Sequence, residues 1–148
     1  MVEHLWFIFA LTAAVLWGLA YVATEKILSL GLTPSFMILI QTVVTFPVAL
    51  LVATQFADIK QQFSIFTGNP MIMALTVFMA FAIVGGEMLI LYSISEKNAT
   101  LASLIEITYP IFTFIFAWIF LKEVQVNWQQ AVGGMLIFSG VILIYLKS

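Results

Sequence analysis

Residues 99 to 121 read ATLASLIEITYPIFTFIFAWIFL, an apolar run that carries Glu106 and Pro110 inside it. A hydrocarbon core about 30 Å thick is spanned by about 20 apolar residues of helix, so this run predicts a membrane helix. A charged side chain near the middle of such a helix costs about 2.5 to 3.5 kcal/mol on insertion scales. We therefore expect Glu106 to be protonated, or paired in a cavity, and not to face lipid as an anion.

The composition of the whole chain predicts the same environment. Hydrophobic residues make up 64% of the 148 residues and charged residues only 8%, with a mean hydropathy of +1.17, which excludes a water-soluble globule. No Arg is present and five Lys are scattered, so no basic face exists for a nucleic acid partner. The absence of Cys excludes disulfides and thiolate chemistry. The N-terminal VEH lacks the positive charge of a signal peptide, so the first apolar run is expected to be retained.

Five apolar runs follow one another, separated by short polar segments. They extend from Leu5 to Ala23, from Thr33 to Thr54, from Asn69 to Ser93, from 99 to 121, and from Asn127 to Leu146. Thr33 and Asn69 each precede a proline, a pattern typical of a capped helix start, and Asn127 with Gln130 predicts a capping box. The sequence predicts an all-α integral membrane protein, with about five transmembrane helices in one domain over residues 1–148.

Only one connection is long. It covers residues 55 to 69, and its large apolar residues recur at helical spacing: Phe56, Ile59, Phe63 and Phe66. This pattern predicts an amphipathic segment that lies in the membrane interface, with a substrate gate as the alternative.

The distribution of Lys does not fix the orientation in the membrane. Five spans put the termini on opposite sides. The side that holds the N-terminus carries Lys60 and Lys122, and the other side carries Lys26, Lys97 and Lys147. Orientation follows a clear excess of positive residues in cytoplasmic loops, so two against three leaves insertion in both directions open.

Three segments resemble one EamA-type repeat of the drug/metabolite transporter superfamily, and the resemblance spans essentially the whole chain. They are WGLAYVATEKIL at 17–28, ATLASLIEITYPIFTFIFAWIFLKE at 99–123 and QQAVGGMLIFSGVILIYL at 129–146. The most specific elements are the proline-containing fourth helix that ends in Leu121-Lys122-Glu123 and the glycines of the fifth helix, Gly133-Gly134 and Gly140. The resemblance implies a membrane transporter, located in a cell membrane such as a prokaryotic inner membrane.

Full-length members that resemble this chain carry two five-helix repeats in opposite orientations, whereas this chain has one. Inverted repeats that meet at a midplane site are a common way to build alternating access, so a single repeat needs a second half. The single repeat and the undecided Lys balance predict an antiparallel homodimer in the lipid bilayer. A separately encoded, oppositely oriented paralogous partner is the alternative.

One face of the fourth helix predicts a binding site. Its small and polar residues fall at spacings of three or four: Ser103, Glu106, Tyr109, Pro110, Thr113 and Ala117. Pro110 has no N–H to donate to the carbonyl of Glu106, so a kink is expected there, with that carbonyl unpaired. The face is predicted to line a cavity, and the alternative is a kinked helix whose polar stripe packs against a neighbour.

Glu87 is the second acid in an apolar run, in IVGGEMLIL. It lies ten residues before Lys97 and Glu106 lies nine after, which places both acids roughly 14 Å deep if both runs are helical. Facing carboxyl groups would share a proton or a cation, because two neighbouring carboxylates cannot both ionise cheaply. Pairing of Glu87 with Lys26 or Lys97 is the alternative.

Further polar groups are expected at similar depth. Gln41 and Thr45 are four apart in the second run, as are Trp17 and Tyr21 in the first. With the acids they predict a cluster that holds an amine or other cationic solute by charge and by ring faces. The alternative for Trp17 and Tyr21 is an interfacial aromatic belt.

Small residues indicate places of close helix approach. The glycines of the third and fifth runs, Gly85-Gly86 and Gly133-Gly134, are expected to allow packing more than hinge bending, and Gly18 belongs to a similar ladder with Ala10 and Ala14.

No catalytic set, metal-ligand cluster or phosphate loop occurs in the sequence, so neither an enzyme nor a cofactor is expected. The function that the sequence predicts is secondary transport or export of a small organic solute, with Glu106, aided by Glu87, binding a proton or cation in turn. The alternative is a helper or scaffold subunit that does not transport and stabilises a membrane complex.

Overall fold

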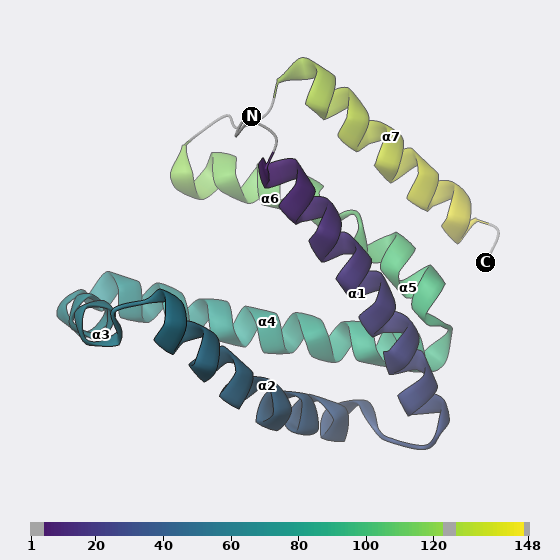
Figure 1. Cartoon of the computed structure of the whole chain (residues 1–148). Helices are drawn as coiled ribbons and strands as arrows, with labels where there is room; N and C mark the ends of the chain where they lie inside the picture. Colours follow the sequence, from purple (N-terminus) through teal and green to yellow (C-terminus); the bar gives the residue numbers. More distant parts are fainter. Residues whose placement is uncertain (1–4, 123–126, 147–148) are drawn as a thin grey trace. The chain divides into compact units, whose positions relative to one another are not determined.

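The chain is helical throughout the part that the structure, a computed structural model, describes: residues 5–122 and 127–146 (Figure 1). The helices in order are α1 (Leu5–Ser29), α2 (Pro34–Phe56), α3 (Ile59–Gly68), α4 (Pro70–Glu96), α5 (Ala99–Glu106), α6 (Tyr109–Phe116), the π-helix η1 (Ala117–Leu121) and α7 (Trp128–Tyr145). The N-terminal VEH at 2–4, Glu123 and Lys147, which were used above, lie outside the described ranges.

Contacts within the chain group it into two units. The first unit combines residues 1–26 with residues 96–148, and the second covers residues 27–95. The first therefore contains most of α1 together with α5, α6, η1 and α7, and the second contains α2, α3 and nearly all of α4.

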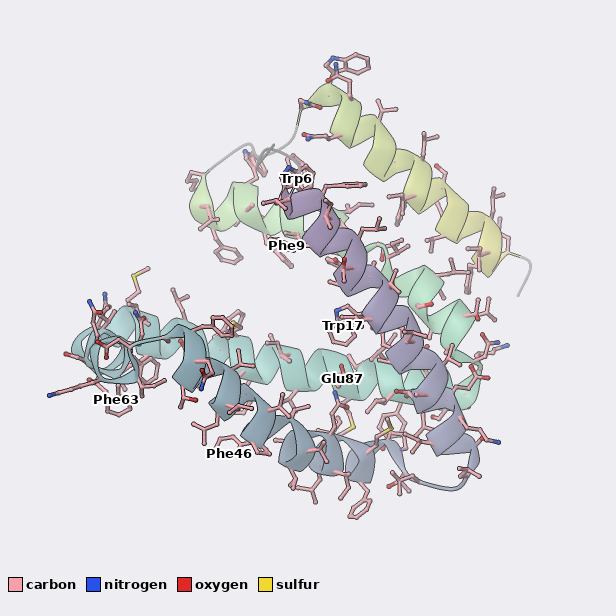
Figure 2. All side chains as sticks on the ribbon, viewed as in Figure 1. Trp6, Phe9, Trp17, Phe46, Phe63 and Glu87 are labelled. Carbon is pink, nitrogen blue, oxygen red and sulfur yellow. The ribbon has the colours of Figure 1, made fainter. Side chains whose placement is uncertain are left out.

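Five segments of the described chain are long and apolar enough to cross a membrane. They are Leu5–Ser29, Pro34–Phe56, Pro70–Glu96, Ala99–Leu121 and Trp128–Tyr145. The predicted fold class, an all-α membrane protein with five spans, is confirmed. Large apolar side chains project from every span, as Figure 2 shows, and Phe9 and Phe46 are each 67% exposed. Lipid tails can cover such surfaces, because they are as apolar as the side chains themselves.

The ends of two helices differ from the prediction. α1 continues to Ser29, past the expected end at Ala23, because Glu25 and Lys26 are good helix formers whose charge does not break a helix. The turn after α1 contains Gly31, which has a φ of +101° and donates its N–H to the carbonyl of Leu28 at 3.0 Å. α4 likewise runs to Glu96, beyond the predicted end at Ser93.

The predicted helix starts are correct in position, but the expected capping hydrogen bond is not present at all of them. Asn69 Oδ1 accepts from the N–H of Met71 at 3.0 Å at the start of α4. Asn127 and Gln130 form the predicted capping box at the start of α7. Thr33 precedes α2 as expected, but its side chain makes no capping hydrogen bond.

The long connection contains the helix α3, which the helical spacing of its apolar residues predicted. Asp58 caps it by accepting from the N–H of Gln61 at 3.1 Å, and Phe63 is 64% exposed (Figure 2). Whether α3 lies in the membrane interface stays a prediction.

Glycines of α4 and α7 lie in open surroundings. A Cβ added at Gly85, Gly86, Gly133 or Gly134 would have no neighbour within 4 Å among the described residues, and the same holds for Gly18 in α1. α4 and α7 pass through these glycines without a break. Packing at these positions therefore stays a prediction that concerns a partner surface.

Candidate functional site: an acid at a helix break

The fourth span is interrupted one turn from its middle. α5 ends at Glu106 and α6 begins at Tyr109, and Figure 1 draws them as separate helices. A tight turn joins them, in which the N–H of Thr108 donates to Ile105 O at 3.1 Å and the N–H of Ile111 donates to Thr108 O at 3.0 Å. Pro110 is the cause, because its nitrogen carries no hydrogen and its ring disfavours helical backbone at the residue before it. The predicted kink is confirmed, and it takes the form of a break.

The carboxyl group of Glu106 is held by a tyrosine from α1. The Tyr21 hydroxyl donates to Glu106 Oε2 with an oxygen to oxygen distance of 2.5 Å. Both side chains are half-buried, and the separation is at the short end of the range for a hydrogen bond from a hydroxyl to a carboxylate. Glu106 thus has a polar partner inside the span, and whether it is protonated or lines a cavity stays a prediction.

Trp17 lies one helical turn before Tyr21 on α1. The two ring centroids are 6.0 Å apart and their planes are inclined at 43°, and the indole is 53% exposed (Figure 2). Trp17, Tyr21 and Glu106 therefore come together within the first unit. An aromatic face beside a carboxyl group is an arrangement that attracts cations, because the ring quadrupole and the acid both favour positive charge.

Ser103 and Tyr109 lie on opposite sides of the break. Ser103 is on α5, three residues before Glu106 and half-buried, with its hydroxyl donating to the carbonyl of Thr100 at 3.0 Å. Tyr109 begins α6 and is 63% exposed. Because the backbone between Glu106 and Tyr109 is not helical, the spacing that predicted one continuous polar face does not carry across the break.

The two remaining predicted site residues belong to the second unit. Gln41 on α2 and Glu87 on α4 are both half-buried, and Figure 2 labels Glu87 on α4. The backbone carbonyl of Gln41 accepts from the Thr45 hydroxyl at 2.8 Å. Because Glu87 and Glu106 lie in different units, their sharing of a proton or cation stays a prediction.

Glu25 is a polar contact of α1 that the sequence did not reveal. Its Oε2 accepts from the N–H of Ala99, the first residue of α5, at 2.7 Å. We interpreted Glu25 from the sequence only as part of a polar boundary. A signal was nevertheless present, because Trp17, Tyr21 and Glu25 follow one another at spacings of four and so share one face of a helix.

A separate groove of about 340 Å³ lies between α6 and α7. Pro110, Ile111 and Phe114 line it from α6, and Gly134 and Phe138 are among the residues that line it from α7. Gln130 contributes the one polar side chain among its lining residues. The groove suits apolar groups, and Pro110 is the one residue of the predicted face of the fourth helix among its lining residues.

Within the described ranges, no group of three or more His, Cys, Asp or Glu side chains comes together to bind a metal ion. The hydrogen bonds described above give the spans of the first unit two polar contacts between distant residues, Tyr21 with Glu106 and Ala99 with Glu25.

Five apolar spans with an acid inside one of them define a polytopic integral membrane protein. The chain belongs to the EamA-like transporter family, whose sequence model matches residues 4–146. Membership indicates a membrane transporter of the drug/metabolite type, and this family is not one of enzymes. No curated protein and no solved structure is significantly similar to the chain.

Proposed function

We propose that the chain is a secondary transporter or exporter of a small organic solute, coupled to protons through Glu106. The observation that carries this proposal is the hydrogen bond from Tyr21 to Glu106 at a helix break inside a membrane span. A carboxyl group inside a membrane span has a high free-energy cost of ionisation, and intramembrane acids commonly mark proton or ion pathways.

The chemistry is an exchange at one carboxyl group. When Glu106 is ionised, its negative charge and the face of Trp17 favour a cationic solute. When it takes up a proton, the charge that holds the cation disappears and the solute is released. Alternation between these two states couples solute movement in one direction to proton movement in the other. The break at Pro110 supports this role, because Pro110 has no N–H to donate to the carbonyl of Glu106, which we expect to offer a second acceptor on the same residue.

We place the working unit in a dimer of oppositely oriented copies, or in a pair with an oppositely oriented paralogue. A single five-helix repeat supplies half of the inverted arrangement on which alternating access commonly rests. Reporter fusions at each terminus test this part separately. Both orientations in one cell are expected for a homodimer, and a single fixed orientation would leave only the paralogous partner.

The central experiment is reconstitution into liposomes with an imposed pH gradient and a panel of amines, amino acids and other metabolites. Solute-dependent proton flux is expected for the native chain and is expected to fall to background in Glu106→Gln, because an amide cannot carry a proton through the cycle. Glu96→Gln is the matched control, since it makes the same chemical change at an exposed acid at the end of α4. Flux that persists in Glu106→Gln contradicts proton coupling through this residue.

The same experiment separates the transporter from a helper subunit. A helper that stabilises a membrane complex is expected to assemble normally in both variants and to give no solute-dependent flux in any vesicle.

A further inference from the structure

The first unit contains two polar contacts between α1 and α5, one at each end of α5. Tyr21 and Glu25 are four residues apart, so they lie one above the other on the same face of α1. Tyr21 contacts Glu106, the last residue of α5, and Glu25 contacts Ala99, the first. α5 is only eight residues long, so these two hydrogen bonds together hold its whole length against α1.

The contact at the start of α5 is a specific one. The first N–H groups of a helix have no partner within the helix, and Asn98 satisfies the N–H of Leu101 at 2.8 Å. Glu25 satisfies the N–H of Ala99 at 2.7 Å. Ala99 is only 3% exposed, so this N–H depends on Glu25, because water has little access to the residue. A carboxylate is the favoured acceptor there, since helix N-termini attract negative charge.

The neighbourhood of Glu25 is buried on both helices. Thr24, the residue before it, is 7% exposed, and Ala102, one turn into α5, is 3% exposed. These are among the few buried residues of the described chain, so the polar contact between Glu25 and Ala99 lies next to side chains that water hardly reaches. The far end of α5 adjoins the break at residues 107 and 108 and has no helical continuation to hold it.

We infer that Glu25 is a positioning residue that acts through the Tyr21 and Glu106 pair. Glu25 holds the first N–H of α5 and so fixes how that short helix is rotated about its axis and shifted along α1. In this position the Glu106 carboxyl group meets the Tyr21 hydroxyl. Without Glu25, the hydrogen bond between Tyr21 and Glu106 is the remaining one of these two polar contacts between α1 and α5. This inference rests on the proposed function only for its consequence for transport, and its geometric content is independent of that function.

Titratable groups on the elements around the pair are few. Within the described residues, α1 carries Tyr21, Glu25 and Lys26, α5 carries Glu106, α6 carries Tyr109 and α7 carries Tyr145. Glu96 lies three residues before Ala99 and contributes charge near the start of α5. A test must therefore separate the hydrogen bond of Glu25 from its charge.

The test compares Glu25→Gln with Glu25→Asp. Gln keeps the length and an oxygen acceptor but loses the charge, whereas Asp keeps the charge but is shorter by one methylene. If the hydrogen bond positions α5, Gln resembles the native chain and Asp is impaired. If charge alone matters, the order is reversed, and the inference is wrong. Glu25→Leu removes both properties, and Glu96→Leu removes a nearby charge without touching the Ala99 contact.

The first readout is spectroscopic and needs no transport. Trp17 becomes the sole tryptophan when Trp6, Trp118 and Trp128 are replaced by Phe, and its emission reports on Tyr21, whose ring centroid lies 6.0 Å away. We expect the emission maximum and the quenching of Trp17 to change in Glu25→Asp and Glu25→Leu, and to stay native in Glu25→Gln and Glu96→Leu. An unchanged Trp17 signal in Glu25→Asp and Glu25→Leu overturns the inference, whether or not the protein transports.

The second readout is a double-mutant cycle on solute-dependent flux. Loss of one hydrogen bond corresponds to about a twofold to tenfold effect, so Tyr21→Phe and Glu25→Asp are each expected to lower flux within that range. Because Glu25 acts through Tyr21, the double variant is expected to be no worse than the more impaired single variant. Additive losses mean that Glu25 works independently of the pair. If the native chain gives no flux, the proposed function fails while the Trp17 readout still decides the role of Glu25.

Discussion

The third and fourth spans both carry an acid in apolar surroundings, yet the helical backbone around the acid differs between them. α4 runs without interruption for 27 residues and passes Gly85-Gly86 directly before Glu87. The fourth span, 99 to 121, is split into α5, α6 and η1, and Glu106 ends the first piece. Two glycines leave the backbone hydrogen bonds of α4 in place, whereas one proline removes an N–H and breaks the helix. The glycines before Glu87 therefore do not interrupt their helix, whereas Pro110, which lacks a backbone N–H donor, interrupts the helix next to Glu106.

The break also ends α5 at the acid, so the carboxyl group lies at a helix terminus and not within a continuous wall of side chains. Tyr21 reaches it from α1. Within η1 the chain stays irregular to its end, where Lys122 adopts a left-handed backbone with a φ of 59°. The fourth span is thus the locally adaptable one, and α4 is the uniform one.

The largest effect on solute-dependent proton flux is expected when Glu106 and Glu87 are each replaced by Gln in separate variants. Glu106→Gln should lower solute-dependent proton flux to background, because Glu106 has the break and the Tyr21 partner. Glu87→Gln should lower it by about tenfold or less, which corresponds to about 1.4 kcal/mol or less, because an acid within a continuous helix assists without being required. Flux into vesicles at matched protein density measures both.

Equal loss in the two variants would revise this ranking. It would favour the sequence-based hypothesis that Glu87 and Glu106 share one proton as a pair, because removal of either member then removes the shared site. Greater loss in Glu87→Gln than in Glu106→Gln would contradict the central role of the break.

A second prediction concerns the backbone of the two spans. Pro110→Ala supplies an N–H that can bond to the carbonyl of Glu106, so the helix is expected to close across residues 107 and 108. We expect stability to rise by about 1 kcal/mol and at most about 3, while solute-dependent flux falls by about tenfold because α5 and Glu106 turn away from α1. Thermal unfolding in one detergent and flux in vesicles provide the two measurements.

Gly85→Ala in α4 is the matched control for that substitution. A Cβ there meets no neighbour within 4 Å among the described residues, so helix propensity alone predicts a gain of about 0.5 to 1 kcal/mol without loss of flux. Full flux in Pro110→Ala would show that the break is dispensable, and lost flux in Gly85→Ala would show that α4 must bend.

Local chemistry explains which parts of this comparison the sequence could predict. The spans follow from hydropathy, because unpaired backbone and charge are costly in lipid. The break follows from Pro110 because its missing N–H is a property of one residue. The hydrogen bond from Ala99 to Glu25 joins residues 74 positions apart, and nothing in either neighbourhood specifies the other. The spacing of Glu25 from Tyr21 indicated a shared face of α1 but not the partner on α5. The end of α1 was predicted too early because Glu and Lys are compatible with helix.

The pair of Tyr21 and Glu106 lies between these cases. Hydropathy marked Glu106 as an acid in need of a partner, and spacing put Tyr21 on one face with Trp17. The choice of Tyr21 as the partner depends on how α1 lies against α5, which is a property of packing and not of either segment. Sequence reasoning consequently gave a set of candidates, of which the structure brings Trp17, Tyr21 and Glu106 together in the first unit.

The smallest effect is expected at the capping residues of the two spans, which are both Asn. Asn69 caps α4 and Asn98 caps α5, and replacing either by Ala should cost about 1 kcal/mol, or about a fivefold increase in opening of the first turn. In the 27-residue α4 that opening should stay local. In the eight-residue α5 it should spread to Glu106, because a helix of two turns has no interior to arrest it. Amide hydrogen exchange in nanodiscs measures both, and unchanged exchange near Glu106 in Asn98→Ala would mean that the contacts of Glu25 and Tyr21 hold α5 without its own cap.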